Sequence, residues 1–330
     1  MKTINVSQPE KRIISKKPTK ISPSLRVFIS SKSKADYSNP ENIFITKNDL
    51  INLNNTTDKI INSDSLYAMQ KIPDNSIKCI ITSPPYWNIV DYGVNGQYGQ
   101  STYKDYLNNL LQVWKQCERV LKPNGKLCIQ TPIMPISKNV INDQHTRHLK
   151  NINNDIEFTI LNNTKLNRYS LFIWQKQTTE KMFGSYPFPP NLYEQNTIEF
   201  INVFVKPGKP EIINKQIKLK SKLSQKQWLD LTKQVWNIYP KDVKRKLHPA
   251  PFPEALPNRL ISMYSFAKSK EHGFSGDIIL DPFCGIGTTC TAAKKLGRRF
   301  TGIELNYDFC IQACKELDKT TYDGIVKLCC

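Results

Sequence analysis

The chain has 330 residues, 39% hydrophobic and 10% aromatic, and a formal net charge of +19 at pH 7. This length and apolar content allow a large buried core and exclude a chain that is disordered throughout. No apolar run approaches the roughly 20 residues that a membrane-spanning helix needs, the first residues lack the apolar stretch of a secretory signal, and none of the nine cysteines forms a CxxC pair. We therefore expect a cytoplasmic protein with reduced thiols, no membrane association and no metal site.

The positive charge is concentrated in two segments. Residues 1–35 contain nine Lys and Arg against one acidic residue, and residues 206–246 contain twelve against three. An AT-rich genome, which favours lysine codons, would explain the abundance of basic residues but not their clustering. This charge pattern favours a polyanionic partner, and nucleic acid is the simplest one.

Taken in chain order, residues 1–40 are polar, basic and proline-containing, and they predict a loosely ordered arm. From residue 58 onward, short β-branched runs alternate with amphipathic stretches, of which 103–121 and 288–296 are the clearest helices. The runs are KIIN, KCIIT, KLCIQT, LFIW, FINVFV, DIIL and RFTGI, at 59–62, 78–82, 126–131, 171–174, 200–205, 277–280 and 299–303. This alternation predicts an α/β fold with a doubly wound, mostly parallel sheet.

Polar or glycine-rich residues follow four of these runs. They are Ser63-Asp64, the tetrapeptide at 83–86, the loop at 281–288 and Glu304. Ligands of doubly wound sheets bind outside the carboxyl ends of the strands. The sequence therefore predicts one binding site at this edge of the sheet.

The string ITSPPYW at 81–87 predicts a rigid corner. A residue before proline is held extended, so Ser83 and Pro84 stay out of a helix, and Pro84 has no N–H. Their carbonyls and the Ser83 hydroxyl are then fixed acceptors for the hydrogens of an exocyclic amino group, and Tyr86 offers a face on which a base can stack. Such a base must leave the duplex. The alternative is an ordinary turn that ends a strand.

The string DPFCGIGTT at 281–289 predicts a cofactor turn between a strand and a helix. Gly285 and Gly287 would let a ligand approach the backbone. Glu304 lies 23 residues after Asp281, where the second strand of a βαβ unit places an acid on ribose hydroxyls. The third glycine of a dinucleotide fingerprint falls at Cys290, which argues against NAD. A structural turn with a solvated glutamate is the alternative.

These two motifs together resemble those of the S-adenosylmethionine-dependent DNA amino-methyltransferases. The Ser form of the tetrapeptide is similar to the cytosine-N4 branch, because the adenine-N6 branch usually carries Asp or Asn there. The order of tetrapeptide, basic segment and cofactor loop is typical of the circularly permuted β group found in restriction–modification systems. Further similar segments lie at 71–77, 119–125, 173–176, 204–206 and 248–259.

The resemblance implies a Rossmann-like methyltransferase fold, with S-adenosyl-L-methionine as cofactor. The implied catalytic residues are Ser83 and Pro84, which would hold the amino group, with Pro85 and Tyr86. The implied cofactor-binding residues are Asp64, Phe252, Pro253, Asp281, Phe283, Gly285, Gly287, Thr288 and Glu304. Methyl transfer needs positioning more than a metal or a strong base. Cys284 is expected to be structural, and Glu199, in a string that lacks the histidine of the family's Asn-His-Glu, receives no role.

Four segments are expected: an arm at 1–40, a catalytic half at 41–205, a target-recognition insert at 206–247 and a cofactor-binding half at 248–330. The predicted DNA phosphate contacts of the insert are Lys218, Lys220, Lys222, Lys226, Lys244, Arg245 and Lys246. Trp228 and Trp236 are expected to pack the insert rather than to read bases. For the arm, DNA contact and a solubilising tail are both open.

The sequence thus predicts a site-specific DNA methyltransferase that modifies N4 of a flipped cytosine in double-stranded DNA. It would protect host DNA in a restriction–modification system, beside a separately acting restriction endonuclease, as a monomer or weak dimer. The alternatives are adenine-N6 methylation and a non-catalytic DNA-binding protein of the same fold. A nicotinamide-dependent oxidoreductase would leave the basic insert without a purpose.

Overall fold

The computed structural model describes residues 44–46, 48, 55–87, 90–136, 148–176, 184–239 and 251–321. All of them belong to one compact unit that begins at Pro40. The predicted arm at 1–40 lies outside the described residues, and so do Lys244, Arg245 and Lys246.

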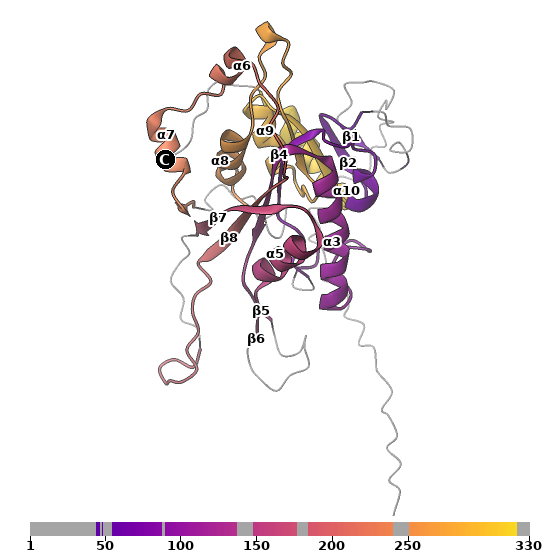
Figure 1. The fold of residues 1–330 in the computed structure, drawn as a ribbon. Helices are drawn as coiled ribbons and strands as arrows, with labels where there is room; N and C mark the ends of the chain where they lie inside the picture. Colours follow the sequence, from indigo (N-terminus) through magenta and orange to yellow (C-terminus); the bar gives the residue numbers. More distant parts are fainter. Residues whose placement is uncertain are drawn as a thin grey trace, which may run out of the picture. The chain divides into compact units, whose positions relative to one another are not determined.

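A sheet forms the centre of this described part (Figure 1). It has nine strands in the order β1-β2-β11-β10-β3-β4-β8-β7-β9. The strands from β1 to β4 in this order are parallel, β8 is antiparallel to both of its neighbours, and β9 is parallel to β7. The bounds are β1 Phe44–Ile45, β2 Lys59–Asn62, β3 Ile77–Thr82, β4 Leu121–Thr131, β7 Asn167–Gln175, β8 Ile198–Val205, β9 Val235–Asn237, β10 Ile278–Asp281 and β11 Arg299–Glu304. Each predicted run falls within one of these strands or overlaps it, and the mostly parallel sheet is confirmed.

Helices cover both faces of the sheet. The helices α2 (Ser65–Met69), α3 (Tyr103–Val120) and α5 (Ile152–Asn163) pack on one face, and α8 (Ala255–Tyr264), α9 (Thr288–Lys295) and α10 (Tyr307–Asp318) on the other. Neighbouring strand residues alternate between the two cores: Ile80 lies in the first and Ile81 in the second. This alternation explains the continuous apolar runs, because strands that are buried on both faces need no polar positions.

The remaining elements lie outside the main sheet and its two helical layers. The strands β5 (Met134–Ile136) and β6 (His148–Lys150) pair with each other, and α6 (Lys215–Leu219), α7 (Gln225–Leu231) and the 3-10 helix η4 (Lys270–His272) lie outside the layers. None of the helices in the described ranges combines the length and the apolar character that a membrane crossing requires.

The helix α3 shows why the predicted helix forms. Thr102 caps its first turn by accepting a hydrogen bond from the backbone N–H of Asp105 at 3.2 Å. Tyr106, Leu110, Trp114 and other residues at helical spacing are buried, so one apolar stripe faces the sheet.

The predicted insert is partly built into the sheet. Trp236 on β9 pairs with Trp174 on β7, and its ring stacks on Phe172 with centroids 4.4 Å apart. The Arg259 guanidinium lies 4.8 Å from the centre of the Trp236 ring. The packing role predicted for Trp236 is confirmed. The same prediction for Trp228 is wrong, because that side chain on α7 is 62% exposed.

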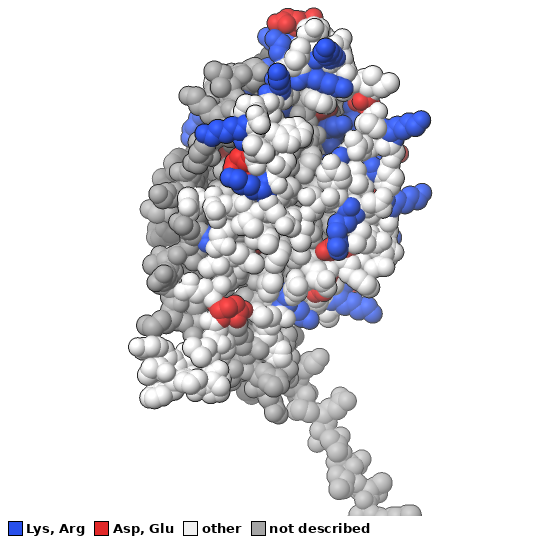
Figure 2. All heavy atoms as spheres, turned by 60° about the vertical axis from the view of Figure 1, so that its left-hand side comes forward, with Lys and Arg blue, Asp and Glu red and all other residues white. Residues whose placement is uncertain are grey.

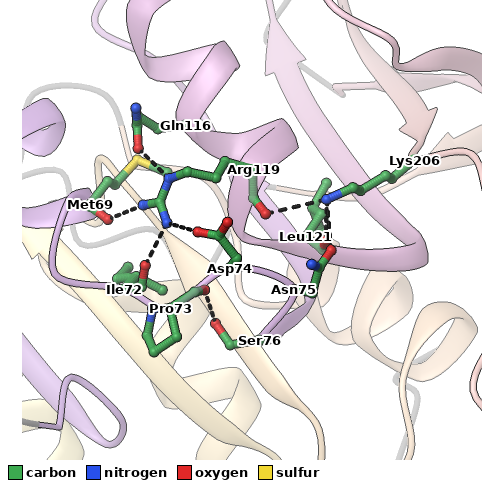
Figure 3. A network of polar contacts seen from close by, with 10 residues as sticks. All are labelled: Met69, Ile72, Pro73, Asp74, Asn75, Ser76, Gln116, Arg119, Leu121 and Lys206. Carbon is green, nitrogen blue, oxygen red and sulfur yellow. Dashed lines mark hydrogen bonds and ion pairs between the residues drawn. The ribbon is translucent and has the colours of Figure 1, made fainter.

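A polar cluster joins elements at the amino edge of the parallel strands (Figure 3). The Arg119 guanidinium at the end of α3 donates to the carbonyls of Met69 at 2.7 Å and Ile72 at 2.9 Å. It also donates to Gln116 at 2.7 Å and pairs with Asp74. The segment at 71–77 is therefore held against α3.

Lys206 extends this cluster after β8. Its ammonium donates to the backbone carbonyls of Arg119 and Leu121, at 3.2 and 2.8 Å, and to the Asn75 side chain at 2.9 Å. Three of the segments that the family resemblance singled out, at 71–77, 119–125 and 204–206, thus meet in one structural joint.

We predict that Arg119→Lys lowers the free energy of unfolding by about 2 kcal/mol, because a lysine cannot reach all four acceptors and leaves carbonyls without a donor. Urea denaturation measures this change. Lys122→Gln is the matched control: it removes only the exposed ion pair of Lys122 with Glu211, which should cost no more than about 1 kcal/mol. Equal losses in the two variants would contradict the prediction.

Candidate functional site

The four predicted strand ends do lie at one edge of the sheet. Glu304 on β11 is in register with Asn62 on β2, and Asp281 on β10 with Gly302 on β11. A pocket of about 800 Å³, including its open mouth, lies at this edge. It is lined by Asp64, Ser65, Ser83, Pro85, Tyr92, Val94, Gly96, Gln97, Tyr98, Pro251, Phe252, Pro282, Phe283, Cys284, Gly285, Ile286, Thr288, Glu304 and Leu305.

This single pocket brings the two motifs together. Ser83 and Pro85 of the tetrapeptide line the same pocket as six of the predicted cofactor residues, namely Asp64, Phe252, Phe283, Gly285, Thr288 and Glu304. Pro253 is buried. Pro84 and Tyr86 are also buried, and they form the inner side of the corner.

Asp281 lies beneath the pocket rather than in its lining. Its carboxylate accepts hydrogen bonds from the hydroxyls of Thr82 at 2.8 Å and Thr289 at 2.7 Å, and from the backbone N–H of Phe283 at 3.1 Å. Burial raises the pKa of Asp281 to about 6, although these hydrogen bonds oppose the rise. The side chain therefore joins β3, β10 and α9 at their site ends.

The glycine turn before α9 is shaped by close packing. Gly287 is the N-cap of α9 with φ 78°, and a Cβ there would lie 2.7 Å from the Cβ of Ala313. The backbone N–H of Gly285 donates to the Glu304 carboxylate at 2.9 Å, and that of Asn306 donates to its other oxygen at 2.8 Å. Burial raises the pKa of Glu304 to about 7.

Asp64 caps α2 at the pocket wall. It accepts from the backbone N–H of Tyr67 at 3.2 Å and from the Tyr98 hydroxyl at 3.0 Å. The Tyr98 ring meets the Phe283 ring edge to face, with centroids 5.7 Å apart. An aromatic wall thus stands beside the glycine turn, where a flat ligand group can pack.

The loop that follows the tetrapeptide is a part of the site that the sequence analysis missed. Tyr92, Val94, Gln97 and Tyr98 line the pocket, and Asn306 donates to the carbonyl of Tyr92 at 2.9 Å. This loop has no helical or strand periodicity that could have marked it. Its tyrosines, close behind the tetrapeptide, are the one signal that was available.

A close backbone approach fixes the end of this loop on the corner. Gly99 has φ 104°, and a Cβ there would lie 2.5 Å from the carbonyl carbon of Trp87. Trp87 is buried, and its indole N–H donates to the carbonyl of Ser101 at 3.1 Å. The rigid corner is therefore held by the chain that leaves it.

The carbonyl and hydroxyl groups of the corner make hydrogen bonds with one another and with neighbouring residues. The Tyr106 hydroxyl donates to the Pro85 carbonyl at 2.8 Å. The Ser83 and Tyr86 hydroxyls lie 2.7 Å apart, and Tyr86 donates to Gln130 at 3.0 Å. Burial raises the pKa of Tyr86 well above its ordinary value, so the phenol keeps its proton.

The cysteines of the described residues are free, and all of them except the half-buried Cys314 are buried. Cys284 lines the pocket, yet the neighbouring Cys290 and burial raise the pKa of its thiol far above the usual range. A neutral, buried thiol is a poor nucleophile, which agrees with the structural role expected for Cys284.

The predicted phosphate contacts that the structure describes lie on α6, α7 and the turn between them. All four are exposed; they are Lys218, Lys220, Lys222 and Lys226. Lys220 lies 3.3 Å from Glu271. Basic side chains outnumber acidic ones on this side of the molecule (Figure 2).

The doubly wound sheet and the shared pocket define a Rossmann-like methyltransferase. The chain belongs to the N6/N4 DNA methyltransferase family, because the family model described as DNA methylase matches residues 77–315. The family resemblance of the two motifs is thereby confirmed.

Individual relatives agree with this assignment. The chain is 29% identical over 290 residues to the type II methyltransferase M.MjaI of Methanocaldococcus jannaschii, covering 76% of this chain and 88% of the relative. A protein of Thermus thermophilus, described as a candidate DNA modification methylase and solved with S-adenosyl-L-methionine, has a TM-score of 0.62 and 26% identity, covering 80% of this chain and 98% of the other. The cytosine-N4-specific PvuII DNA methyltransferase shares the fold, with a TM-score of 0.58 and 17% identity over 78% of this chain and 85% of that one.

The buried Asp281 leads to a prediction about stability and pH. Its folded pKa of about 6 lies above the unfolded value of about 3.9, so its contribution to stability is greatest below the unfolded pKa and is lost as the pH rises through about 6. As the pH rises from about 4 to about 6, the free energy of unfolding of the wild type should fall by up to about 3 kcal/mol relative to that of Asp281→Asn. Urea denaturation at several pH values measures the difference, and a constant difference would contradict the raised pKa.

Proposed function

We propose that this protein methylates the exocyclic N4 of a cytosine at a specific site in double-stranded DNA, with S-adenosyl-L-methionine as the methyl donor. The observation that carries the proposal is the single pocket shared by Ser83 of the tetrapeptide and the glycine turn with Glu304. A methyl donor on the turn would place its reacting group beside an amino group held at the corner.

The cofactor part of the pocket suits an adenosyl group. The Glu304 carboxylate would accept hydrogen bonds from ribose hydroxyls, as acids at this strand end do in related folds. Asp64, Tyr98 and Phe283 form the adjoining wall, and Phe252 would border the methionine end. The bound cofactor would supply an electrophilic methyl group, so the protein itself needs only to position the nucleophile.

The corner suits an uncharged amino group. Ser83 is half-buried at the pocket surface, and Pro84 behind it is buried and cannot donate a backbone hydrogen bond. The Ser83 hydroxyl and the Pro84 carbonyl would accept the two hydrogens of the amino group and turn its lone pair toward the methyl group. The hydroxyl of Ser83, where the adenine-N6 branch of the family usually carries Asp or Asn, favours cytosine over adenine.

The DNA part of the proposal depends on charge and exposure. The lysines of α6 and α7 lie at the surface, where they can approach phosphates, and the exposed Trp228 stands among them. Phosphate contacts would position the duplex, and a flipped base would then reach the corner at the strand edge. The relative M.MjaI is named a type II methyltransferase, which supports a role in restriction–modification.

The direct test is to incubate the protein with unmethylated genomic DNA and labelled S-adenosyl-L-methionine, digest the product and identify the methylated nucleoside by mass. N4-methylcytosine is expected. N6-methyladenine would retain the pocket assignment but refute the role of Ser83 in base choice. Cofactor binding without any methylated nucleoside would favour a non-catalytic DNA-binding protein.

The raised pKa of Glu304 predicts how cofactor affinity depends on pH. In the free protein this carboxyl is protonated about half the time near pH 7, whereas ribose hydroxyls would donate to its ionised form. Affinity for S-adenosylhomocysteine, measured by calorimetry, should therefore be about tenfold weaker at about pH 6 than at about pH 8.

Glu304→Gln is the matched variant for this measurement, because it has the same shape and does not titrate. We expect weaker binding at high pH and no pH dependence over the same range. A flat wild-type profile would contradict this prediction.

A further inference from the structure

A chain of buried polar contacts runs from the Ser83 hydroxyl away from the pocket and across three strands. The Ser83 and Tyr86 hydroxyls lie 2.7 Å apart, and Tyr86 donates to the amide oxygen of Gln130 on β4 at 3.0 Å. The amide nitrogen of Gln130 donates to Glu199 on β8. Glu199 is paired with the Lys176 ammonium, just beyond the end of β7.

The far end of this chain fixes the direction of its hydrogen bonds. The lysine ammonium only donates, and a carboxylate only accepts. Glu199 therefore receives hydrogens from both Lys176 and Gln130. With its NH₂ group turned to Glu199, the Gln130 amide can present only its oxygen to Tyr86.

The near end then has one possible arrangement. Tyr86 has a single hydroxyl hydrogen and donates it to Gln130, so it can only accept from Ser83. The single hydroxyl hydrogen of Ser83 is thereby directed to Tyr86. The lone pairs of the Ser83 oxygen remain available to the pocket.

We propose that Glu199 and Gln130 are positioning residues that hold the Ser83 hydroxyl as a hydrogen-bond acceptor for the target amino group. The proposal rests on the proposed function, because it assigns Ser83 the amino group of the base. It gives a role to a buried charge that lies two strands away from the tetrapeptide and that would otherwise be a costly feature of the sheet.

The substitution Glu199→Gln tests the proposal with almost no change of shape. The Lys176 ammonium would take the new amide oxygen, so the new NH₂ group would face Gln130. The Gln130 amide would turn over and donate to Tyr86, Tyr86 would donate to Ser83, and the Ser83 hydrogen would point at the amino group. We expect the single-turnover methylation rate to fall tenfold or more, with cofactor affinity unchanged.

Two further variants separate this role from a merely structural one. In a Ser83→Ala background, Glu199→Gln should not lower the rate further, because the hydroxyl that it orients is absent. Adding Lys176→Met to Glu199→Gln should restore part of the rate, because the new amide can then turn its oxygen back to Gln130. A structural defect would lower the rate equally in both backgrounds and would worsen when Lys176 is removed.

Glu157→Gln is the matched control. Glu157 on α5 is also a buried carboxylate in an ion pair, with Arg168 on β7, but it does not reach the corner. Its variant should methylate at the wild-type rate. If Glu199→Gln does not fold, as judged by thermal unfolding and cofactor binding, Tyr86→Phe tests the near end: it should lower the rate tenfold or more, and not at all in the Ser83→Ala background.

The outcomes distinguish this inference from the proposed function. A wild type that forms no methylated nucleoside would refute the proposed function. Suppose that the wild type methylates DNA. The positioning role alone would then be overturned if Glu199→Gln is as active as the wild type, or if it lowers the rate by the same factor with Ser83 and with Ser83→Ala.

Discussion

The geometry of the site depends on the hydrogen bonds of one buried carboxylate, that of Asp281. Burying a charge is costly unless hydrogen bonds surround it, and Asp281 meets this requirement with donors from two other elements and from the turn that follows it. Thr82 precedes the tetrapeptide, and Thr289 stands in the first turn of α9. The corner and the glycine turn are thus tied to the same side chain, and their relative position follows from its hydrogen bonds.

The two edges of the sheet have different tasks. At the amino edge, Arg119 and Lys206 join three short motifs by binding backbone carbonyls, with no pocket-lining residue among them. At the carboxyl edge, the motifs expose acceptors, a glycine turn and aromatic faces. Family motifs therefore mark both the joint that holds the strands and the pocket that uses them, and a motif match alone does not tell these apart.

Much of the fold could be predicted from the sequence, because strands buried on both faces have a strong local signature and parallel strands put their ends at one edge. The parts that were missed depend on contacts between distant residues. Glu199 received no role because its neighbours in the sequence lack a histidine, whereas its partners, Gln130 and Lys176, lie elsewhere in the sheet. The wrong prediction for Trp228 has the same cause, because the sequence spacing of Trp228 and Trp236 does not show which of the two side chains packs against β7.

The way the basic segment at 206–246 is attached limits how this segment could be exchanged between related proteins. Arg259 on α8 donates to the Asp230 carboxylate at 2.8 Å and to its carbonyl at 2.6 Å, and it lies over Trp236, which stacks on Phe172. A chimaera in which a foreign segment replaces the residues up to 239 would lose Asp230 and Trp236, the partners of Arg259 and Phe172. Junctions that keep Asp230 and Trp236 with the recipient, and exchange only the exposed turns of α6 and α7, would preserve these contacts.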